Sequence, residues 1–277
     1  ESYKLPLAKL LPVYCALRAN KSKLKKTSKF IASHSFQKQI YSKYLGLKAQ
    51  DICVIPQPVD VDSFCPGART ADEIREYEKK LRIESGAIKI VHVSRLFWDK
   101  MDAILSIINA TPSIVQEFPN TQILLVGQGE CFDYIVELAK RVNQRLGRRA
   151  IIVTGPIRVG DMPRLMGLAD IIIGVGRVSL EAMASGKPVI VAGNIVGPFG
   201  GDYGGIVTPD NVNELEAHNF SGRNSSVRTR PYKVAEDCIK LLADKKYRLY
   251  LGNFERKYIA EEHDIKKVVR QIEAVYN

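Results

Sequence analysis

Short apolar segments recur along the chain and are separated by longer, more polar segments. The apolar segments are five or six residues long and alternate little with polar residues: residues 88–93, 122–126, 150–154, 170–175 and 188–192. Such segments are typical of parallel strands that are buried on both faces, because crossover helices cover the two sides of the sheet. The pattern therefore predicts an α/β fold with a doubly wound parallel sheet.

The longer segments between and after these strands predict helices. The expected helices cover residues 70–82, 101–118, 131–146, 162–168, 231–243, 246–261 and 264–276. A glycine-rich connection is expected at 197–205, and a surface loop rich in Asn, Ser, Gly and Arg at 219–230.

The N-terminal region predicts a separate and less regular part of the chain. Residues 1–30 read as an amphipathic helix, and Ser33 or Ser35 is expected to cap a helix that reaches Leu45. A short strand ends at Pro56 and is followed by an extended linker, because residues before proline avoid the helical conformation. We expect three parts: an N-terminal remnant with a linker at 1–65, the sheet domain at 66–245, and C-terminal helices at 246–277.

A glycine turn after the strand at 170–175 is the most informative local motif. Gly174-Val175-Gly176 lets the backbone turn sharply and leaves no side chain in front of it. Free N–H groups at the start of the following helix favour an anion there. Glu181 lies about one turn inside that helix, where a carboxylate can hold ribose hydroxyls or can simply stabilise the helix N-terminus. The motif predicts a nucleotide or sugar-nucleotide ligand.

Further candidate ligand groups follow the neighbouring strands. In an open parallel sheet, ligands bind beyond the carboxyl ends of the strands. Arg95 and Lys100 follow the strand at 88–93, and both can reach a diphosphate, Arg as a two-pronged donor and Lys as a point charge. The alternative is that Arg95 pairs with a nearby carboxylate and Lys100 is solvated. Gly127-Gln128-Gly129 and Gly155 follow the next two strands, so we expect all these groups on one edge.

The net charge of +11 arises almost entirely from the N-terminal region. Residues 1–50 contain eleven Lys or Arg and one acidic residue, whereas the other 227 residues contain 30 basic and 29 acidic residues. The excess is centred on Lys21, Lys23, Lys25, Lys26 and Lys29. Such a cluster can meet anionic lipid or a phosphate-bearing substrate, or it can be a solvated helix face. No nucleic-acid partner is expected, because no aromatic stacking motif or known binding module lies near the cluster.

Composition excludes several other classes of protein. No apolar run approaches the length that spans a membrane, and the N-terminus does not resemble a signal peptide. The five cysteines are widely spaced without a CxxC pair, so they predict reduced thiols and neither a zinc site nor a disulfide framework. We expect a cytoplasmic protein that can associate peripherally with the inner face of the membrane.

Three motifs, taken together and in order, resemble a known family. They are Val93-Ser94-Arg95-Leu96 with Lys100, Leu125-Val126-Gly127-Gln128-Gly129, and Leu180-Glu181-Ala182-Met183-Ala184-Ser185-Gly186-Lys187-Pro188-Val189. Residues 28–277 resemble the donor-binding half of the retaining glycosyltransferases of family 4 (group 1), which have the GT-B fold. Ile52–Val59 is similar to the interdomain linker of that family, with Gln57 and Pro58 in place of Asn-Gly.

The resemblance implies a role for each matching residue. Arg95 and Lys100 would bind the donor diphosphate and stabilise the leaving nucleotide as negative charge develops. Glu181 matches the second glutamate of the family's E-x7-E motif and would hold the ribose.

The resemblance also assigns roles to two turns. Gly176 and the backbone N–H groups of Arg177 and Val178 would face the distal phosphate, and the turn from Gly155 to Ile157 would lie beside the base. No cofactor or bound metal is expected, and the donor substrate is a nucleotide-diphosphate sugar. The implied acceptor is a sugar, a lipid-linked molecule or a glycan, as in cell-envelope polysaccharide synthesis.

Two departures from the family pattern bear on activity. The first glutamate of E-x7-E falls at Ile173, which puts selection of the donor sugar in question, and Arg177 is one residue that can take over part of that role. Only about 60 residues precede the linker and the chain begins at Glu1 without Met, so the acceptor half is expected to be mostly absent. The expected function is sugar transfer with retention. Non-catalytic nucleotide-sugar binding and epimerisation of a nucleotide sugar are the alternatives.

Overall fold

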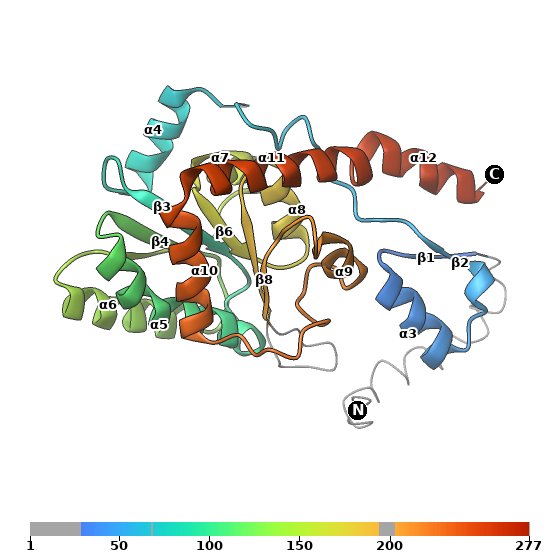
Figure 1. Cartoon of the computed structure of the whole chain (residues 1–277), viewed down its shortest axis with the longest axis horizontal. Coiled ribbons are helices and arrows are strands. Elements are labelled where there is room, and N and C mark those ends of the chain that lie inside the picture. The colour runs from blue at the N-terminus through green and yellow to red at the C-terminus, as the bar shows by residue number, and fades with distance from the viewer. Residues whose placement is uncertain (1–28, 68, 194–202, 277) are drawn as a thin grey trace.

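The computed structural model describes residues 29–67, 69–193 and 203–276. A six-stranded sheet lies at its centre, in the order β5-β4-β3-β6-β7-β8 (Figure 1). Its strands are β3 Ile88–Val93, β4 Thr121–Val126, β5 Ile151–Thr154, β6 Ile171–Gly174, β7 Val189–Ala192 and β8 Tyr203–Ile206. The first five are parallel, and they are the five strands that the apolar segments predicted.

The strand order reverses once, between β3 and β6. The chain builds β4 and β5 on one side of β3, then returns and builds β6, β7 and β8 on the other side. This is the doubly wound arrangement predicted from the sequence. In open α/β sheets such a reversal forms a crevice at the carboxyl ends of the two strands, here β3 and β6, because the connections from them leave in opposite directions.

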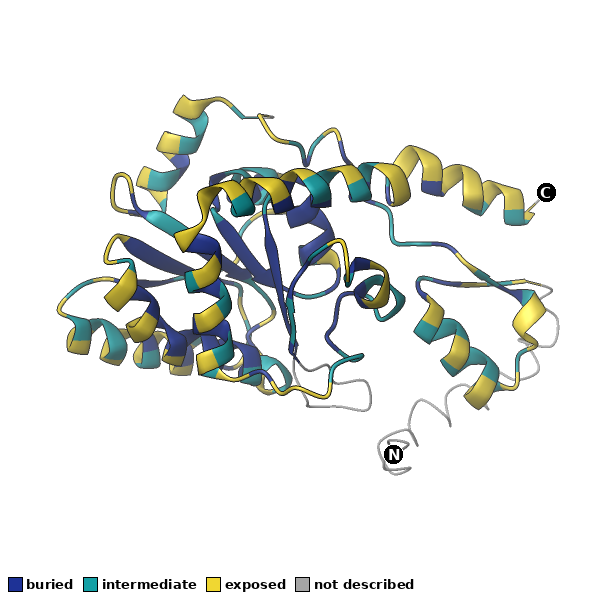
Figure 2. Cartoon of the chain, viewed as in Figure 1, coloured by how far each residue is buried: buried dark blue, intermediate teal, exposed yellow. Residues whose placement is uncertain are grey.

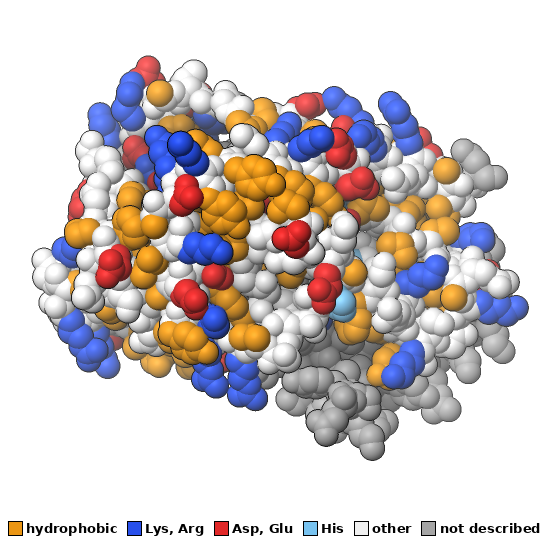
Figure 3. Space-filling model, in the orientation of Figure 1, with side chains coloured by type: hydrophobic (Ala, Val, Ile, Leu, Met, Phe, Trp, Pro, Cys, Tyr) orange, Lys and Arg blue, Asp and Glu red, His pale blue; other side chains and the backbone are white. Residues whose placement is uncertain are grey.

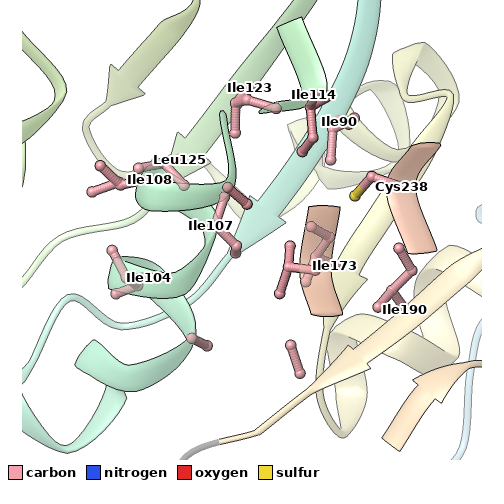
Figure 4. Packing of buried hydrophobic residues seen from close by; sticks show 14 of the residues in the cluster. Ile90, Ile104, Ile107, Ile108, Ile114, Ile123, Leu125, Ile173, Ile190 and Cys238 are labelled. Carbon is pink, nitrogen blue, oxygen red and sulfur yellow. The ribbon is translucent and has the colours of Figure 1, made fainter. Parts of the chain in front are cut away.

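Helices cover both faces of the sheet, so the strands are buried on both sides (Figure 2). On one face lie α5 Met101–Glu117, α6 Phe132–Leu146 and α10 Pro231–Ala243, which form the hydrophobic cluster of Figure 4 with the side chains of Ile90, Ile173 and Ile190. On the other face lie α4 Ala71–Lys80, α7 Met162–Leu168, α8 Arg177–Ala184 and α9 Val212–Ala217. The apolar strands thus hold two separate cores, one for each layer of helices.

Local sequence signals set several helix ends. Thr70 accepts a hydrogen bond from the backbone N–H of Glu73, and the Glu73 side chain accepts one from the backbone of Thr70. This reciprocal capping box is worth about 1 kcal/mol relative to an alanine cap. Gly147 ends α6 in the left-handed conformation, with φ of 64°.

The last strand differs from the expectation of a purely parallel sheet. β8 pairs with β7 in the antiparallel direction, and its residues Tyr203–Ile206 include the end of the glycine-rich connection expected at 197–205. Only ten residues separate β7 from β8, fewer than a parallel crossover needs. Gly204 fits this strand because a Cβ there would lie 2.8 Å from the Leu215 side chain. The other expected loop, 219–230, contains no helix or strand.

A small βαβ unit precedes the main sheet. It consists of β1 Phe30–Ala32, α3 Ser35–Leu45 and β2 Ile52–Val54, and the two strands are parallel. The expectation that Ser33 or Ser35 caps α3 is wrong. His34 is the cap, since its Nδ1 accepts from the Gln37 N–H at 3.2 Å, while the Ser33 hydroxyl donates to the Gln37 side chain. The helix expected at 1–30 lies almost entirely outside the described residues.

The C-terminal helices pass beside the linker that leaves the βαβ unit. α11 Lys245–Glu262 and α12 Ile265–Tyr276 meet at His263, and Val59 forms a parallel bridge with Asp264 (Figure 1). Val59 donates to the His263 carbonyl at 2.8 Å, and Ile265 donates to the Val59 carbonyl at 3.0 Å. In the part of the chain that the structure describes, no helix is long and apolar enough to cross a membrane.

Candidate functional site

The carboxyl edge of the sheet brings the predicted ligand groups into one row. In the order β5, β4, β3 and β6, the strands are followed by Gly155, the turn at Gly127–Gly129, the loop that holds Arg95 and Lys100, and Gly176. Adjacent strands are about 4.8 Å apart, so the two ends of this row are ~14 Å apart. Arg95 and Gly176 follow β3 and β6, and they therefore flank the crevice where the strand order reverses.

The loop after β3 presents one exposed cation and one partly shielded cation. The Arg95 side chain is exposed, and its guanidinium carbon lies 5.9 Å from the centre of the Phe97 ring. Lys100 is half-buried, and its Nζ lies 3.2 Å from a carboxylate oxygen of Asp99. Among the described residues Arg95 forms no salt bridge, so the expected alternative of a paired arginine is not what the structure shows.

The glycines after β4 support this loop. A Cβ on Gly127 would collide with the Ser94 carbonyl, and one on Gly129 would lie 2.3 Å from the Leu96 carbonyl oxygen. The two loops are joined by hydrogen bonds from Leu96 N to the Gln128 carbonyl (3.0 Å) and from Cys131 N to the Leu96 carbonyl (2.9 Å). The Gly-Gln-Gly turn therefore fixes the backbone on either side of Arg95 through close packing.

The start of α8 is an open helix N-terminus. Gly176 has φ of 57° and ψ of −127°, which only glycine adopts readily, and its side of the helix has no side-chain cap. The N–H groups of Arg177 and Val178 follow directly. A helix N-terminus carries partial positive charge, so this turn attracts an anion.

Glu181 and Arg177 form an ion pair along the first turn of α8. The Glu181 Oε1 accepts from the Arg177 Nε at 2.8 Å, the Arg177 side chain is 62% exposed, and Glu181 is buried. Burial raises the pKa of the Glu181 carboxyl more than the hydrogen bond and charge of Arg177 lower it. A cation at a helix N-terminus opposes the helix dipole, so Arg177 is badly placed for stability and well placed for an anionic ligand.

Ile173 does not face this edge at all. Its side chain is fully buried in β6 and packs into the cluster of Figure 4. Its carbonyl accepts from Nδ1 of His92 at 2.8 Å, and burial lowers the pKa of His92 to about 4. His92 is therefore a neutral core histidine, and residue 173 offers no group to a ligand.

At the other end of the row, the turn after β5 is open. A Cβ on Gly155 would meet no atom within 4 Å. Ile157 is partly buried and packs against the core on one face of the sheet. An aliphatic side chain beside free space is a suitable contact for a planar ring.

Two residues that the sequence pattern did not single out also reach this edge. Asn219 and Phe220 follow α9 and have φ of 58° and 47°. The Phe220 carbonyl accepts from the Gly176 N–H at 3.1 Å. Asn tolerates the left-handed conformation, so Asn219 gave a weak turn signal, but nothing in the sequence identifies a left-handed phenylalanine.

Acidic and metal-binding side chains are not gathered at this edge. Within the described ranges no group of three or more His, Cys, Asp or Glu residues could hold a metal ion. The polar groups described at this edge are cations, backbone N–H groups, the Asn219 amide and the carboxylates of Asp99 and Glu181. This set suits a phosphate-bearing ligand with hydroxyl groups.

Residues 87–218, which include the whole row, match the model of the family described as glycosyl transferases group 1. The matched segment is similar to that family. It spans β3 to α9, so the crevice between β3 and β6 belongs to it entirely.

Two curated proteins and one solved structure are similar to the chain. A glycosyltransferase of Methanocaldococcus jannaschii is 23% identical over 74% of this chain and 48% of its own length. A GDP-mannose-dependent monoacylated alpha-(1-6)-phosphatidylinositol monomannoside mannosyltransferase of Corynebacterium glutamicum is 28% identical over 75% of this chain and 51% of its own length. The crystal structure of Anabaena Alr3699/HepE in complex with UDP and glucose superimposes with a TM-score of 0.69 and 20% identity, over 95% of this chain and 67% of that chain.

Each of these similarities covers only part of the relative. The chain spans about half the length of the curated relatives it matches. The likeness to the Anabaena structure shows a shared fold at 20% identity.

Proposed function

We propose that residues 87–218 bind a nucleotide-diphosphate sugar. We propose further that they belong to a retaining transferase of family 4 with the GT-B fold, which takes its sugar from this donor. The observation that carries the proposal is the reversal of strand order between β3 and β6, where the loop with exposed Arg95 follows β3 and the uncapped start of α8 follows β6. Open α/β sheets bind nucleotides at this place. The names of the relatives support a nucleotide sugar as donor.

In this proposal each end of the row binds a different part of the donor. The base lies beside Gly155 and Ile157, and Glu181 accepts hydrogen bonds from the ribose with the oxygen that Arg177 leaves free. The diphosphate lies between Arg95, Lys100 and the turn at Gly176, where the N–H groups of Arg177 and Val178 face it.

Sugar transfer leaves a nucleoside diphosphate with an added negative charge. Arg95, Lys100 and the dipole of α8 are placed where this charge develops, so they stabilise the transition state more than the bound donor. We expect these groups to act without a bound metal or another cofactor.

The acceptor is a sugar, a lipid-linked molecule or a glycan in this proposal, as in synthesis of cell-envelope polysaccharide. The Corynebacterium relative acts on a phosphatidylinositol mannoside, which supports an acceptor at a membrane surface. On the face shown in Figure 3, Lys and Arg are mixed with Asp and Glu. We assign contact with an anionic inner membrane surface to the basic residues near the N-terminus, because residues 1–50 contain eleven Lys or Arg and one acidic residue. Co-sedimentation with anionic vesicles at low salt tests this, and protein left in the supernatant rejects it.

Calorimetric titration of the full chain with UDP, GDP and ADP tests the donor site. We expect one of the three to bind, and Glu181→Ala to weaken that binding about tenfold through loss of the ribose contact. Glu137→Ala is the matched control, because Glu137 forms the same kind of ion pair with Arg141 on exposed α6. Absence of binding by all three nucleotides sinks the proposal.

Transfer itself needs a second measurement. Product analysis by NMR with the full-length protein should show a glycoside with the anomeric configuration of the donor. Donor binding with no transfer would favour a non-catalytic domain, and conversion of the donor sugar to its epimer would favour an epimerase.

A further inference from the structure

A segment that follows α9 lies over the glycine turn of α8. Helix α9 ends in a tight turn, in which Asn219 N donates to the Glu216 carbonyl and Phe220 N donates to the Leu215 carbonyl, both at 2.7 Å. The Phe220 carbonyl then accepts from Gly176 N. The turn after α9 is thus fastened to the residue that begins the open helix N-terminus.

The backbone of this turn is strained. Two consecutive residues with side chains have positive φ, and one of them is a bulky phenylalanine, which is an outlier in this region. Burial of the Phe220 ring, 1% exposed, and the bond to Gly176 hold it in place. Strained residues of this kind persist only where the surroundings fix them, and they concentrate at ligand sites.

The strained turn places a polar side chain in front of Gly176. The Asn219 Nδ2 lies 3.4 Å from the position that a Cβ on Gly176 would occupy. Asn219 is only partly buried, and in the described part of the chain its side-chain amide makes no hydrogen bond. Among the described residues, this amide with both a donor and an acceptor therefore has no hydrogen-bond partner beside the start of α8.

The same edge lacks a sugar-facing group at the position where the family resemblance puts one. Ile173 is buried in the core, and Arg177 is engaged by Glu181. The phosphate already has the N–H groups of α8 and two further cations. None of the residues named so far is placed to form hydrogen bonds with the neutral hydroxyl groups of the sugar.

We infer that Asn219 is a donor-binding residue that contacts a hydroxyl group of the donor sugar and contributes to sugar selection. The inference rests on the proposed function, because it assumes a nucleotide sugar in the crevice. The turn 218–221 then has two roles. Its backbone fixes Gly176, and the Asn219 amide forms a hydrogen bond with the sugar.

Replacement of Asn219 by glycine separates the effect of its side chain from the effect of the backbone conformation. Glycine adopts positive φ without strain, so Asn219→Gly removes the amide and leaves the turn intact. We expect about tenfold weaker binding of the nucleotide sugar, less than twofold change for the matching nucleoside diphosphate, and an unchanged or raised Tm. Asn219→Asp keeps an acceptor but places negative charge near the diphosphate, so it should weaken both ligands.

A matched control tests whether relief of strain alone changes binding. Arg82 also has positive φ, 55°, and it lies on the opposite edge of the sheet. Arg82→Gly should leave both affinities unchanged. The probes are UDP with UDP-glucose and GDP with GDP-mannose, titrated calorimetrically into the full chain.

The outcomes of this experiment separate the two proposals. Wild-type protein that binds neither nucleotide nor nucleotide sugar contradicts the proposed function. Wild-type binding with an Asn219→Gly variant that keeps its affinity for the sugar donor, or loses both ligands equally, overturns the role of Asn219 and leaves the donor site standing.

Discussion

The two ends of the strands in the central sheet, called here the carboxyl edge and the amino edge, are built in opposite ways. At the carboxyl edge Arg95 is exposed, α8 begins without a side-chain cap, and the turn at Asn219 is strained. At the amino edge α11 is pressed against the end of α8 so closely that a Cβ on Gly252 would lie 2.3 Å from the Gly186 carbonyl oxygen.

Two charged side chains at the amino ends of the strands form hydrogen bonds with the backbone of the protein. The guanidinium of Arg256 donates to the carbonyls of Phe64 and Ala184, each at 2.9 Å. Glu255 is fully buried and accepts from Val189 N at 3.2 Å. The amino ends of the strands are therefore closed by packing, whereas the carboxyl ends keep an exposed cation and an uncapped helix start.

The largest effect on the free energy of unfolding should come from overpacking the contact between α11 and the end of α8. Gly252→Ala forces a methyl group onto the Gly186 carbonyl, and overpacking of this kind costs about 3 kcal/mol. Urea denaturation should show the loss in the free energy of unfolding, while nucleotide affinity of the remaining folded protein stays unchanged. Weaker nucleotide binding by this variant would show that the two edges are not independent.

The opposite result is expected for the exposed cation at the carboxyl edge. Arg95→Ala removes charged hydrogen bonds to a diphosphate, which are worth about 2 kcal/mol or roughly 30-fold in affinity. The free energy of unfolding should change little, because the side chain is exposed. Arg141→Ala, which removes an exposed arginine from α6, should change neither quantity. Full affinity in Arg95→Ala would remove this residue from the site.

A pH series should distinguish the buried carboxyl groups of the two edges. Burial raises the pKa of Glu255 well above its ordinary value, and only the hydrogen bond from Val189 opposes this. The unfolded chain ionises first as the pH rises, so the folded state loses stability above the ordinary pKa, by at most about 1.4 kcal/mol per pH unit.

Glu255→Gln should abolish that loss. The difference in free energy of unfolding between variant and wild type should therefore grow from pH 5 to pH 6. Glu181→Gln should give a smaller difference of the same sign, because Arg177 offsets part of the burial. A flat difference for Glu255→Gln would show that this carboxyl group is not held neutral.

The smallest change in stability is expected at the open end of the row. A methyl group at Gly155 meets no atom within 4 Å, so Gly155→Ala should alter the free energy of unfolding by less than about 0.5 kcal/mol. If the base lies there, nucleotide affinity should fall several-fold. Gly160→Ala, also in open space, is the control and should leave affinity unchanged. Equal affinities for both variants would move the base elsewhere.

Most of the fold and half of the candidate site could be read from local patterns. The apolar segments gave the five parallel strands because a strand buried on both faces must be apolar throughout. Gly176 and Arg95 were recognisable because a glycine turn and a cation after a strand have meaning from their position alone. The division of the chain at residues 65 and 245 stays a prediction.

Long-range packing decided the rest. The sequence by itself determined a doubly wound sheet and proposed a candidate ligand edge, since strand period, helix starts and glycine turns are properties of neighbouring residues. Only the tertiary structure placed Ile173 in the core, turned β8 antiparallel, made His34 the cap of α3, and laid Asn219 over Gly176. These outcomes depend on which distant segment fills each space, and distant contacts leave no periodic signal along the chain.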